Sequence, residues 1–194
     1  KKGERKKSKF FKRLAFDEIL STFLMASEIR KKIKKVKKQK KIFNLKIQNK
    51  ILSRLNFDLT NDQKKSLNEI NQDLMSNQKM FRLLQGDVGS GKTIVALSAA
   101  SNVISSGFQV AVMAPTEILA RQHYLLSKEI FCKNIKVGIL TSKSEPKEKK
   151  TTIKRLANNE INIVFGTHAV FQKKIIFKKL GLIIIDEQHK FGVN

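Results

Sequence analysis

Gly86-Asp87-Val88-Gly89-Ser90-Gly91-Lys92-Thr93 decides the fold, because this stretch fits the pattern G-x-x-x-x-G-K-[ST]. The flanks fit as well. Residues 81–85 are apolar enough for a short buried strand, and residues 93–105 carry apolar side chains at helical spacing. Strand, loop and helix form the context in which such a loop binds phosphate. Its glycines let backbone N–H groups turn inward, and the helix N-terminus adds partial positive charge.

The loop residues predict a site for a nucleoside triphosphate with Mg²⁺. Lys92 is expected to reach the outer phosphates, and the Thr93 hydroxyl is expected to hold the metal ion. The other phosphate-binding candidates are Gly86, Asp87, Gly89, Ser90 and Gly91. The alternative is a glycine-rich turn that contains Lys-Thr by chance, and the flanking strand and helix patterns argue against it.

After this loop, short apolar runs alternate with helical patterns, which predicts an α/β domain with a mostly parallel sheet flanked by helices. The runs are continuous, as expected for strands buried on both faces. Strands are predicted over 110–114, 135–140, 161–166 and 180–186, and helices over 117–131, 147–158 and 168–172.

Asp186 and Glu187 end the last predicted strand. Open parallel sheets bind ligands at the C-terminal ends of their strands, so this pair is expected to meet the phosphate loop at one edge. Asp186 could then hold Mg²⁺ opposite Thr93, and Glu187 could orient or deprotonate an attacking water. An isolated Asp-Glu pair would more simply be a solvated loop. Its occurrence together with the phosphate loop favours the catalytic interpretation.

The N-terminal part has a different pattern. Residues 1–12 form a Lys-rich tail expected to be disordered, and residues 14–41 predict one long amphipathic helix within a linker region over 13–50. That helix could lie on a membrane surface, but docking on a neighbouring domain is favoured. Thr60 and Gln63 fit a capping box that opens a helix reaching Met75. The main domain is predicted over 51–194.

Composition limits the class of partner. The formal net charge is +24, from 40 basic and 16 acidic residues among 194, which favours a polyanion such as nucleic acid or an anionic membrane. Part of this excess could instead be compositional drift, because Lys greatly outnumbers Arg. Cys132 is the single cysteine, so no disulfide framework or thiolate metal cluster is expected and a reducing cytosol is the natural setting. No transmembrane run or secretory signal is present in the sequence.

Several stretches resemble the motifs of superfamily 2 helicases, and as a set they resemble the RecG family of bacterial ATP-dependent branched-DNA helicases. The resemblance covers residues 14–194 and is carried by 14–20, 57–63, 82–93, 113–123, 165–169 and 186–193. Lys190 stands where the family usually has Arg. The transcription-repair coupling translocases are the nearest rival, and they usually carry Glu where Gln188 stands.

The resemblance implies a RecA-like first motor domain that binds ATP. Gln63 would read the adenine edge with Phe57 packing near the base, although the capping box alone could account for Gln63. Gln188 and His189 would couple the nucleotide to DNA. The implied DNA track is Pro115, Thr116, Arg121, Gly166, Thr167 and His168. Thr116 could equally be a helix N-cap, and His168 a turn residue.

The implied function is ATP-driven translocation on duplex DNA and remodelling of forks and Holliday junctions in recombination and repair. A monomer in the bacterial cytoplasm, associated with the nucleoid, is expected. The family places a second motor domain with an arginine finger after the first, and a DNA-binding wedge domain before it. Neither is expected within these residues, so this chain is expected to bind nucleotide weakly and hydrolyse it hardly at all. The alternatives are a transcription-repair coupling translocase, an RNA helicase and a non-catalytic nucleotide-binding fragment.

Overall fold

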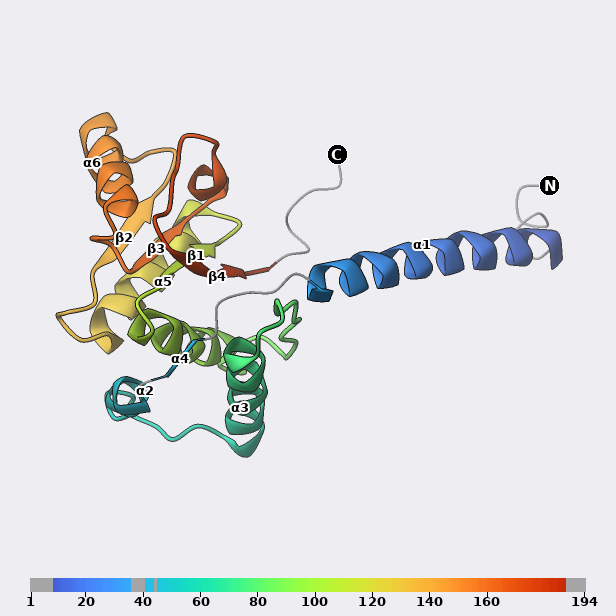
Figure 1. Cartoon of the computed structure of the whole chain (residues 1–194), viewed down its shortest axis with the longest axis horizontal. Coiled ribbons are helices and arrows are strands. Elements are labelled where there is room, and N and C mark those ends of the chain that lie inside the picture. Colours follow the sequence, from blue (N-terminus) through green and yellow to red (C-terminus); the bar gives the residue numbers. More distant parts are fainter. Residues whose placement is uncertain (1–8, 36–40, 44, 188–194) are drawn as a thin grey trace.

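The computed structural model describes residues 9–35, 41–43 and 45–187. A four-stranded parallel sheet, ordered β2-β3-β1-β4, forms the centre of the α/β part (Figure 1). The elements are α1 (Lys9–Lys35), α2 (Leu45–Leu52), α3 (Asn61–Met75), α4 (Lys92–Ser105), β1 (Gln109–Met113), α5 (Glu117–Ile130), β2 (Val137–Leu140), α6 (Pro146–Ala157), β3 (Ile163–Gly166), the 3-10 helix η2 (His168–Phe171) and β4 (Leu180–Ile185). The predicted α/β class with a parallel sheet is confirmed.

The two faces of the sheet have separate apolar cores. Val110 and Val112 of β1 join Phe165 of β3 in a core with α3 and α4. Ala111 and Val164 point to the opposite face, where they pack with Leu156 of α6. This alternation follows from the two-residue period of a strand. Because helices cover both faces of β1 and β3, every residue of these two strands is buried, as predicted.

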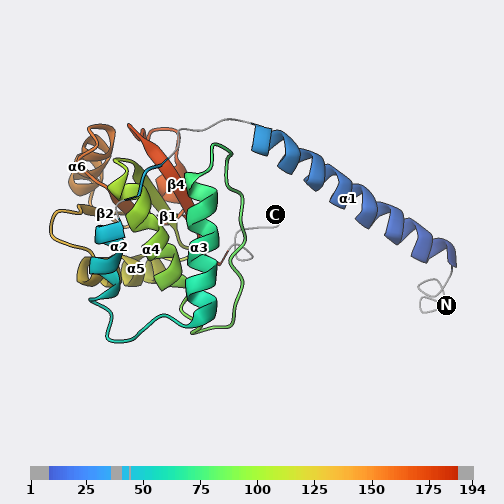
Figure 2. The same ribbon diagram turned by 60° about the horizontal axis from the view of Figure 1, so that its bottom comes forward.

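Helices α2, α3 and α4 form one layer that carries the phosphate loop at the start of α4 (Figure 2). A buried polar contact joins them. Asn102 Nδ2 donates to Gln48 Oε1 at 2.7 Å and to Asn71 Oδ1 at 2.9 Å. The predicted capping box at Thr60 and Gln63 is present, and α3 ends at Met75 as predicted. Ile51 of α2 is fully buried in the same core, and the predicted start of the main domain at residue 51 falls within α2.

The predicted strand over 81–85 is wrong. Residues 79–87 form no strand, and Phe81 and Leu83 are 68% and 74% exposed. Arg82 holds this segment against α3, because its guanidinium lies 2.7 Å from Glu69 and 2.9 Å from Asp73. Strand β1 is paired on both sides, with β3 and with β4. Among the described strands, an additional strand could therefore pair only at an outer edge of the sheet.

The prediction that all strands are buried on both faces is wrong for β4. This strand lies at the edge of the sheet, and Ile183 and Ile185 are 47% and 46% exposed. Leu182 points to the α4 face and is buried. Helix α6 packs on the far strand β2, and in the described part of the chain no helix covers the corresponding face of β4.

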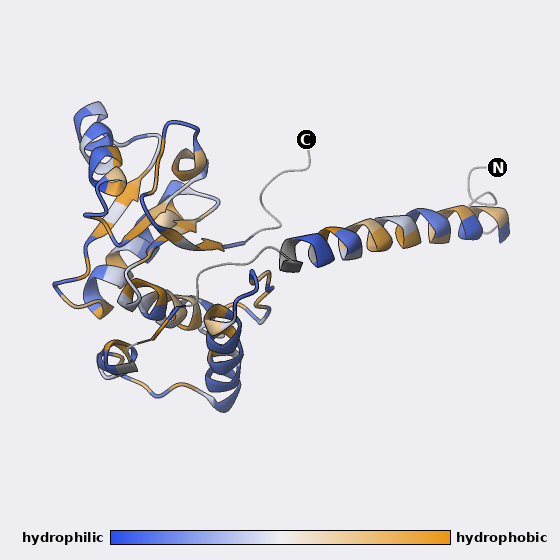
Figure 3. Cartoon of the chain, in the orientation of Figure 1, coloured by the Kyte–Doolittle hydropathy of each residue, from blue (hydrophilic) through white to orange (hydrophobic). Residues whose placement is uncertain are grey.

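Helix α1 projects away from the α/β part in two views (Figures 1 and 2). It begins at Lys9, so residues 9–12 of the predicted tail are helical; residues 1–8 and 36–40 lie outside the described residues. The side chains of Phe10, Leu14 and Phe23 are exposed on α1. Figure 3 shows hydrophobic residues recurring along the helix between hydrophilic ones. None of the described helices has the length and apolar character needed to cross a membrane.

Candidate nucleotide site

The phosphate loop runs from Gly86 into α4 and depends on its glycines. Gly89 and Gly91 have φ angles of 80° and 79°, in the left-handed region that residues with a side chain rarely adopt. Gly91 is also the N-cap of α4, so the loop delivers the chain directly to a helix N-terminus. The loop residues from Gly86 to Ser90 are exposed, and the Ser90 N–H donates to the Asp87 carbonyl at 3.2 Å within the turn.

Lys92 closes the loop on itself. Its ammonium group donates to the backbone carbonyls of Gly86 and Asp87, both at 2.6 Å. The cation therefore lies within the turn of the loop, where a phosphate group would meet it together with the helix N-terminus. Thr93 follows in the first turn of α4 and is half-buried.

Asp186 lies directly after β4, at the C-terminal end of that strand. Its backbone N–H donates to the carbonyl of Met113 at 2.8 Å, which continues the pairing of β4 with β1 by one residue. His123 of α5 contacts its carboxylate, with 2.7 Å between Nε2 and Oδ2. This hydrogen bond lowers the pKa of Asp186, burial acts in the opposite direction, and the charge of Lys92 lowers it further. The Asp186 carboxylate is therefore ionised at neutral pH and offers its oxygens as metal ligands.

Glu187 has an unusual backbone for a residue with a side chain. Its φ is 51°, in the left-handed region, and its backbone N–H contributes to lowering the pKa of Asp186. Such a conformation costs about 1–2 kcal/mol for a residue other than glycine. Strain of this kind concentrates at functional sites.

The two predicted metal ligands fit Mg²⁺ by their chemistry. Thr93 offers a hydroxyl oxygen and Asp186 an ionised carboxylate. Mg²⁺ prefers oxygen donors, and in nucleotide sites it is held by one or two protein groups together with phosphates and water. In the described residues no group of three or more His, Cys, Asp or Glu side chains could hold a metal ion.

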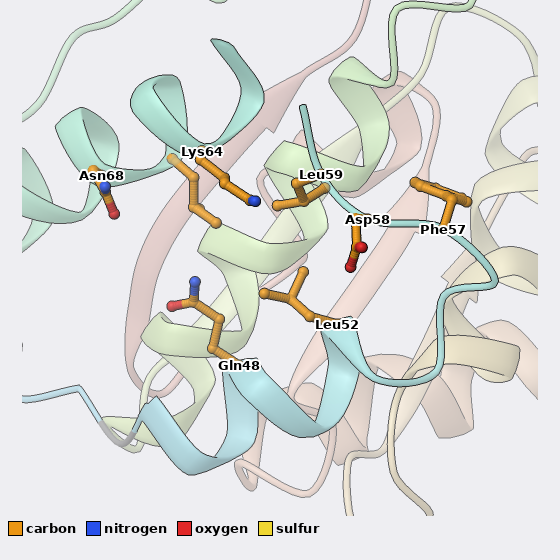
Figure 4. A pocket seen from close by; sticks show the side chains of 8 residues that line it. Gln48, Leu52, Phe57, Asp58, Leu59, Lys64 and Asn68 are labelled. Atoms are coloured by element: carbon orange, nitrogen blue, oxygen red, sulfur yellow. The ribbon is translucent and has the colours of Figure 1, made fainter. Parts of the chain in front are cut away.

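Gln63 joins α3 to the phosphate loop. Its side-chain amide donates to the carbonyl of Ser90 at 2.9 Å, and its oxygen accepts from the backbone of Thr60 at 2.9 Å. The capping role and a position beside the loop thus occur together. Phe57 is 53% exposed and lies at one end of a pocket of about 320 Å³ between α2 and α3 (Figure 4). Lys64, the neighbour of Gln63, lines the same pocket.

The residues predicted to contact DNA follow β1 and β3, so they share the C-terminal edge of the sheet with Asp186. Thr116 is the N-cap of α5, because its hydroxyl accepts from the backbone of Leu119 at 3.3 Å. Gly166 is buried, and a side chain there would overlap the carbonyl of Leu140. Its packing alone therefore requires glycine. The remaining candidates, Pro115, Arg121, Thr167 and His168, are exposed or half-buried.

Two sequence-predicted residues, Gln188 and His189, lie outside the described residues. One residue of the site received no role from the sequence. His123 belongs to the stretch 113–123, but nothing local indicates its contact with Asp186. The available signal is its spacing in α5, three residues after buried Ala120 and four before buried Ser127. This spacing places an imidazole on the sheet-facing side of the helix.

Known proteins resemble this chain in sequence and in structure. The DEAD/DEAH box helicase family model matches residues 60–194, which include the phosphate loop and Asp186-Glu187. The chain belongs to this helicase family. Two curated relatives are the ATP-dependent DNA helicase RecG of Aquifex aeolicus, 44% identical over 95% of this chain, and that of Thermotoga maritima, 46% identical over 93%.

A solved structure of RecG bound to a three-way DNA junction matches this helicase domain with a TM-score of 0.83 and 43% identity over 94% of the chain. The chain spans 23% of the length of each of the two curated relatives and 25% of that solved chain. The resemblance inferred from the motifs is therefore confirmed, and it concerns about a quarter of a RecG protein.

Proposed function

We propose that this chain is the first motor domain of an ATP-dependent helicase that remodels branched DNA at forks and Holliday junctions. The observation that carries the proposal is the proximity of the phosphate-loop lysine to the carboxylate after β4, because the charge of Lys92 lowers the pKa of Asp186. The likeness to a RecG solved with a three-way DNA junction supports the substrate class.

Each residue of the site would have a separate task. Backbone N–H groups of the loop and the ammonium of Lys92 would hold phosphate oxygens, and Gln63 would contact the adenine edge. Thr93 and Asp186 would hold Mg²⁺, which supplies charge neutralisation on the phosphates when bound. Glu187 would orient the attacking water and accept its proton.

The DNA track would run along the C-terminal edge of the sheet. Thr116 and Arg121 of α5, with Thr167 and His168 after β3, offer hydroxyl and basic groups at this edge. Such groups hold the phosphate backbone without reading sequence. Gln188 and His189, immediately after Glu187, would link this track to the nucleotide.

Hydrolysis would require a second motor domain that supplies an arginine finger, which is worth about 10³–10⁵ in rate. The chain alone should therefore bind nucleotide weakly and hydrolyse it hardly at all. A DNA-stimulated rate in this chain approaching that of the full-length protein would contradict the two-domain requirement.

The substrate class is tested by ATPase stimulation in the full-length protein with forked DNA, linear duplex DNA and RNA at one salt concentration. Forked DNA should stimulate most. Stimulation by RNA that exceeds stimulation by forked DNA would overturn the proposal in favour of an RNA helicase. Equal stimulation by linear and forked duplexes would favour a translocase of the transcription-repair coupling type.

A further inference from the structure

His123 fixes the side chain of Asp186, whose backbone is already fixed by the sheet. The hydrogen bond from Asp186 N–H to Met113 sets the position of its Cα but does not stop the carboxylate from rotating, and the partners of that carboxylate are the backbone N–H of Glu187 and His123. The 2.7 Å contact between His123 Nε2 and Asp186 Oδ2 restricts that rotation. Because an ionised carboxylate only accepts hydrogen bonds, Nε2 carries the hydrogen.

The imidazole is itself well anchored. The side chain of His123 is 12% exposed and that of Asp186 is 28% exposed, so the pair is largely shielded from water on the His123 side. Helix α5, which carries His123, packs on β2 and β3 and is capped at its N-terminus by Thr116. At its other end, Arg54 donates to the carbonyl of Phe131 at 2.7 Å.

We propose that His123 is a positioning residue for the metal-binding carboxylate: it holds Asp186 Oδ2 and so fixes the orientation of the group that would bind Mg²⁺. This inference rests on the proposed function, in which Asp186 binds Mg²⁺. Partners that orient a metal ligand typically change metal affinity by about 10–100-fold when they are removed. The contact also joins the metal carboxylate to α5, the helix whose first turns carry Thr116 and Arg121.

The test is the gain in affinity for a fluorescent ADP analogue when Mg²⁺ is added, measured on this chain. His123→Leu removes the hydrogen bond and should lower the Mg²⁺-dependent gain about 10-fold, while affinity without Mg²⁺ stays unchanged. His123→Gln places an amide nitrogen close to the position of Nε2 and should restore most of the gain. His123→Asn places its nitrogen nearer the position of Nδ1 and should not restore it.

This pattern separates positioning from folding, because a general loss of structure would lower binding with and without Mg²⁺. Asp186→Asn tests the proposed metal site itself, on which the inference about His123 rests. If Asp186→Asn abolishes the Mg²⁺-dependent gain and His123→Leu leaves it intact, His123 has no positioning role and the inference is wrong. If neither the wild-type chain nor Asp186→Asn shows any such gain, the proposed metal site is wrong as well.

Discussion

The two halves of the candidate site are built in different ways. Asp186 is anchored by the sheet, since β4 pairs with β1 and the pairing continues through its own backbone N–H. The phosphate loop follows a segment that lies outside the sheet and is held to α3 by Arg82 and Gln63. Polar side chains of α3, more than strand pairing, therefore set the position of the loop relative to Asp186.

The largest expected effect comes from the loop half. Lys92→Ala removes the cation from the turn and should lower nucleotide affinity by about 10–100-fold, because a hydrogen bond from a charged group contributes about 1.5–3 kcal/mol. Titration with a fluorescent nucleotide measures the change. Lys65→Ala, which removes an exposed lysine of α3, is the matched control and should leave affinity almost unchanged. An equal loss in both variants would mean that only overall charge attracts the nucleotide.

The helix layer beneath the loop offers the largest effect on stability. Asn102→Ala removes two buried hydrogen bonds and leaves the acceptors of Gln48 and Asn71 without this donor. The free energy of unfolding should fall by about 2–3 kcal/mol, measured by urea denaturation. Asn68→Ala removes an exposed amide from α3 and should change it by less than about 0.5 kcal/mol. A change below about 0.5 kcal/mol in Asn102→Ala would show that this contact does not hold the layer together.

Arg82 tests whether α3 holds the segment before the loop. Both ion pairs of Arg82 are partly exposed, so Arg82→Ala should lower the free energy of unfolding by only about 0.5–1 kcal/mol. Hydrogen exchange should nevertheless rise in residues 79–87 and stay constant in β4. Unchanged exchange in 79–87 would mean that another contact fixes this segment. The ion pairs of Arg82 with α3 would then not be what positions the phosphate-loop half of the site.

Gln63 gives the smallest effect and separates its two contacts. Thr60→Ala removes the cap, which is worth about 1 kcal/mol of stability, but keeps the amide donor to Ser90. Gln63→Ala keeps this cap, whose donor is the Gln63 backbone N–H, and removes the side-chain contacts with the Thr60 N–H and the Ser90 carbonyl. If Gln63 reads the adenine edge, only Gln63→Ala should reduce the preference for ATP over GTP in competition binding. The same loss of preference in both variants would assign Gln63 to the capping box alone.

The sequence predicted those parts that depend on local pattern. The capping box at Thr60 and the helix that ends at Met75 follow from side chains close in sequence, and so do the glycines of the loop. Strands β1 and β3 were predictable because their continuous apolar runs are buried on both faces. In the site, Lys92 and Asp186 were found because each belongs to a recognisable motif.

The rest depends on tertiary partners that a local pattern does not contain. Residues 81–85 have the apolar character of a strand, but a strand requires a neighbour, and Arg82 binds α3 instead. An apolar run also cannot indicate which strand lies at an edge, so the exposure of Ile183 was missed. Helix α2 is only eight residues long, so its pattern does not stand out from the predicted linker region over 13–50, in which it begins. The contact between His123 and Asp186 joins residues far apart in the chain.

The central claim is that the two separately anchored halves form one nucleotide site. A double-mutant cycle tests it most directly, with Mg²⁺-ATP affinity measured for the wild-type chain, Lys92→Ala, Asp186→Asn and the double variant. If both residues bind the same ligand, their effects should be coupled by about 0.5–3 kcal/mol. Additive effects within about 0.3 kcal/mol, the range found for independent positions, would contradict the claim that Lys92 and Asp186 act on one bound nucleotide.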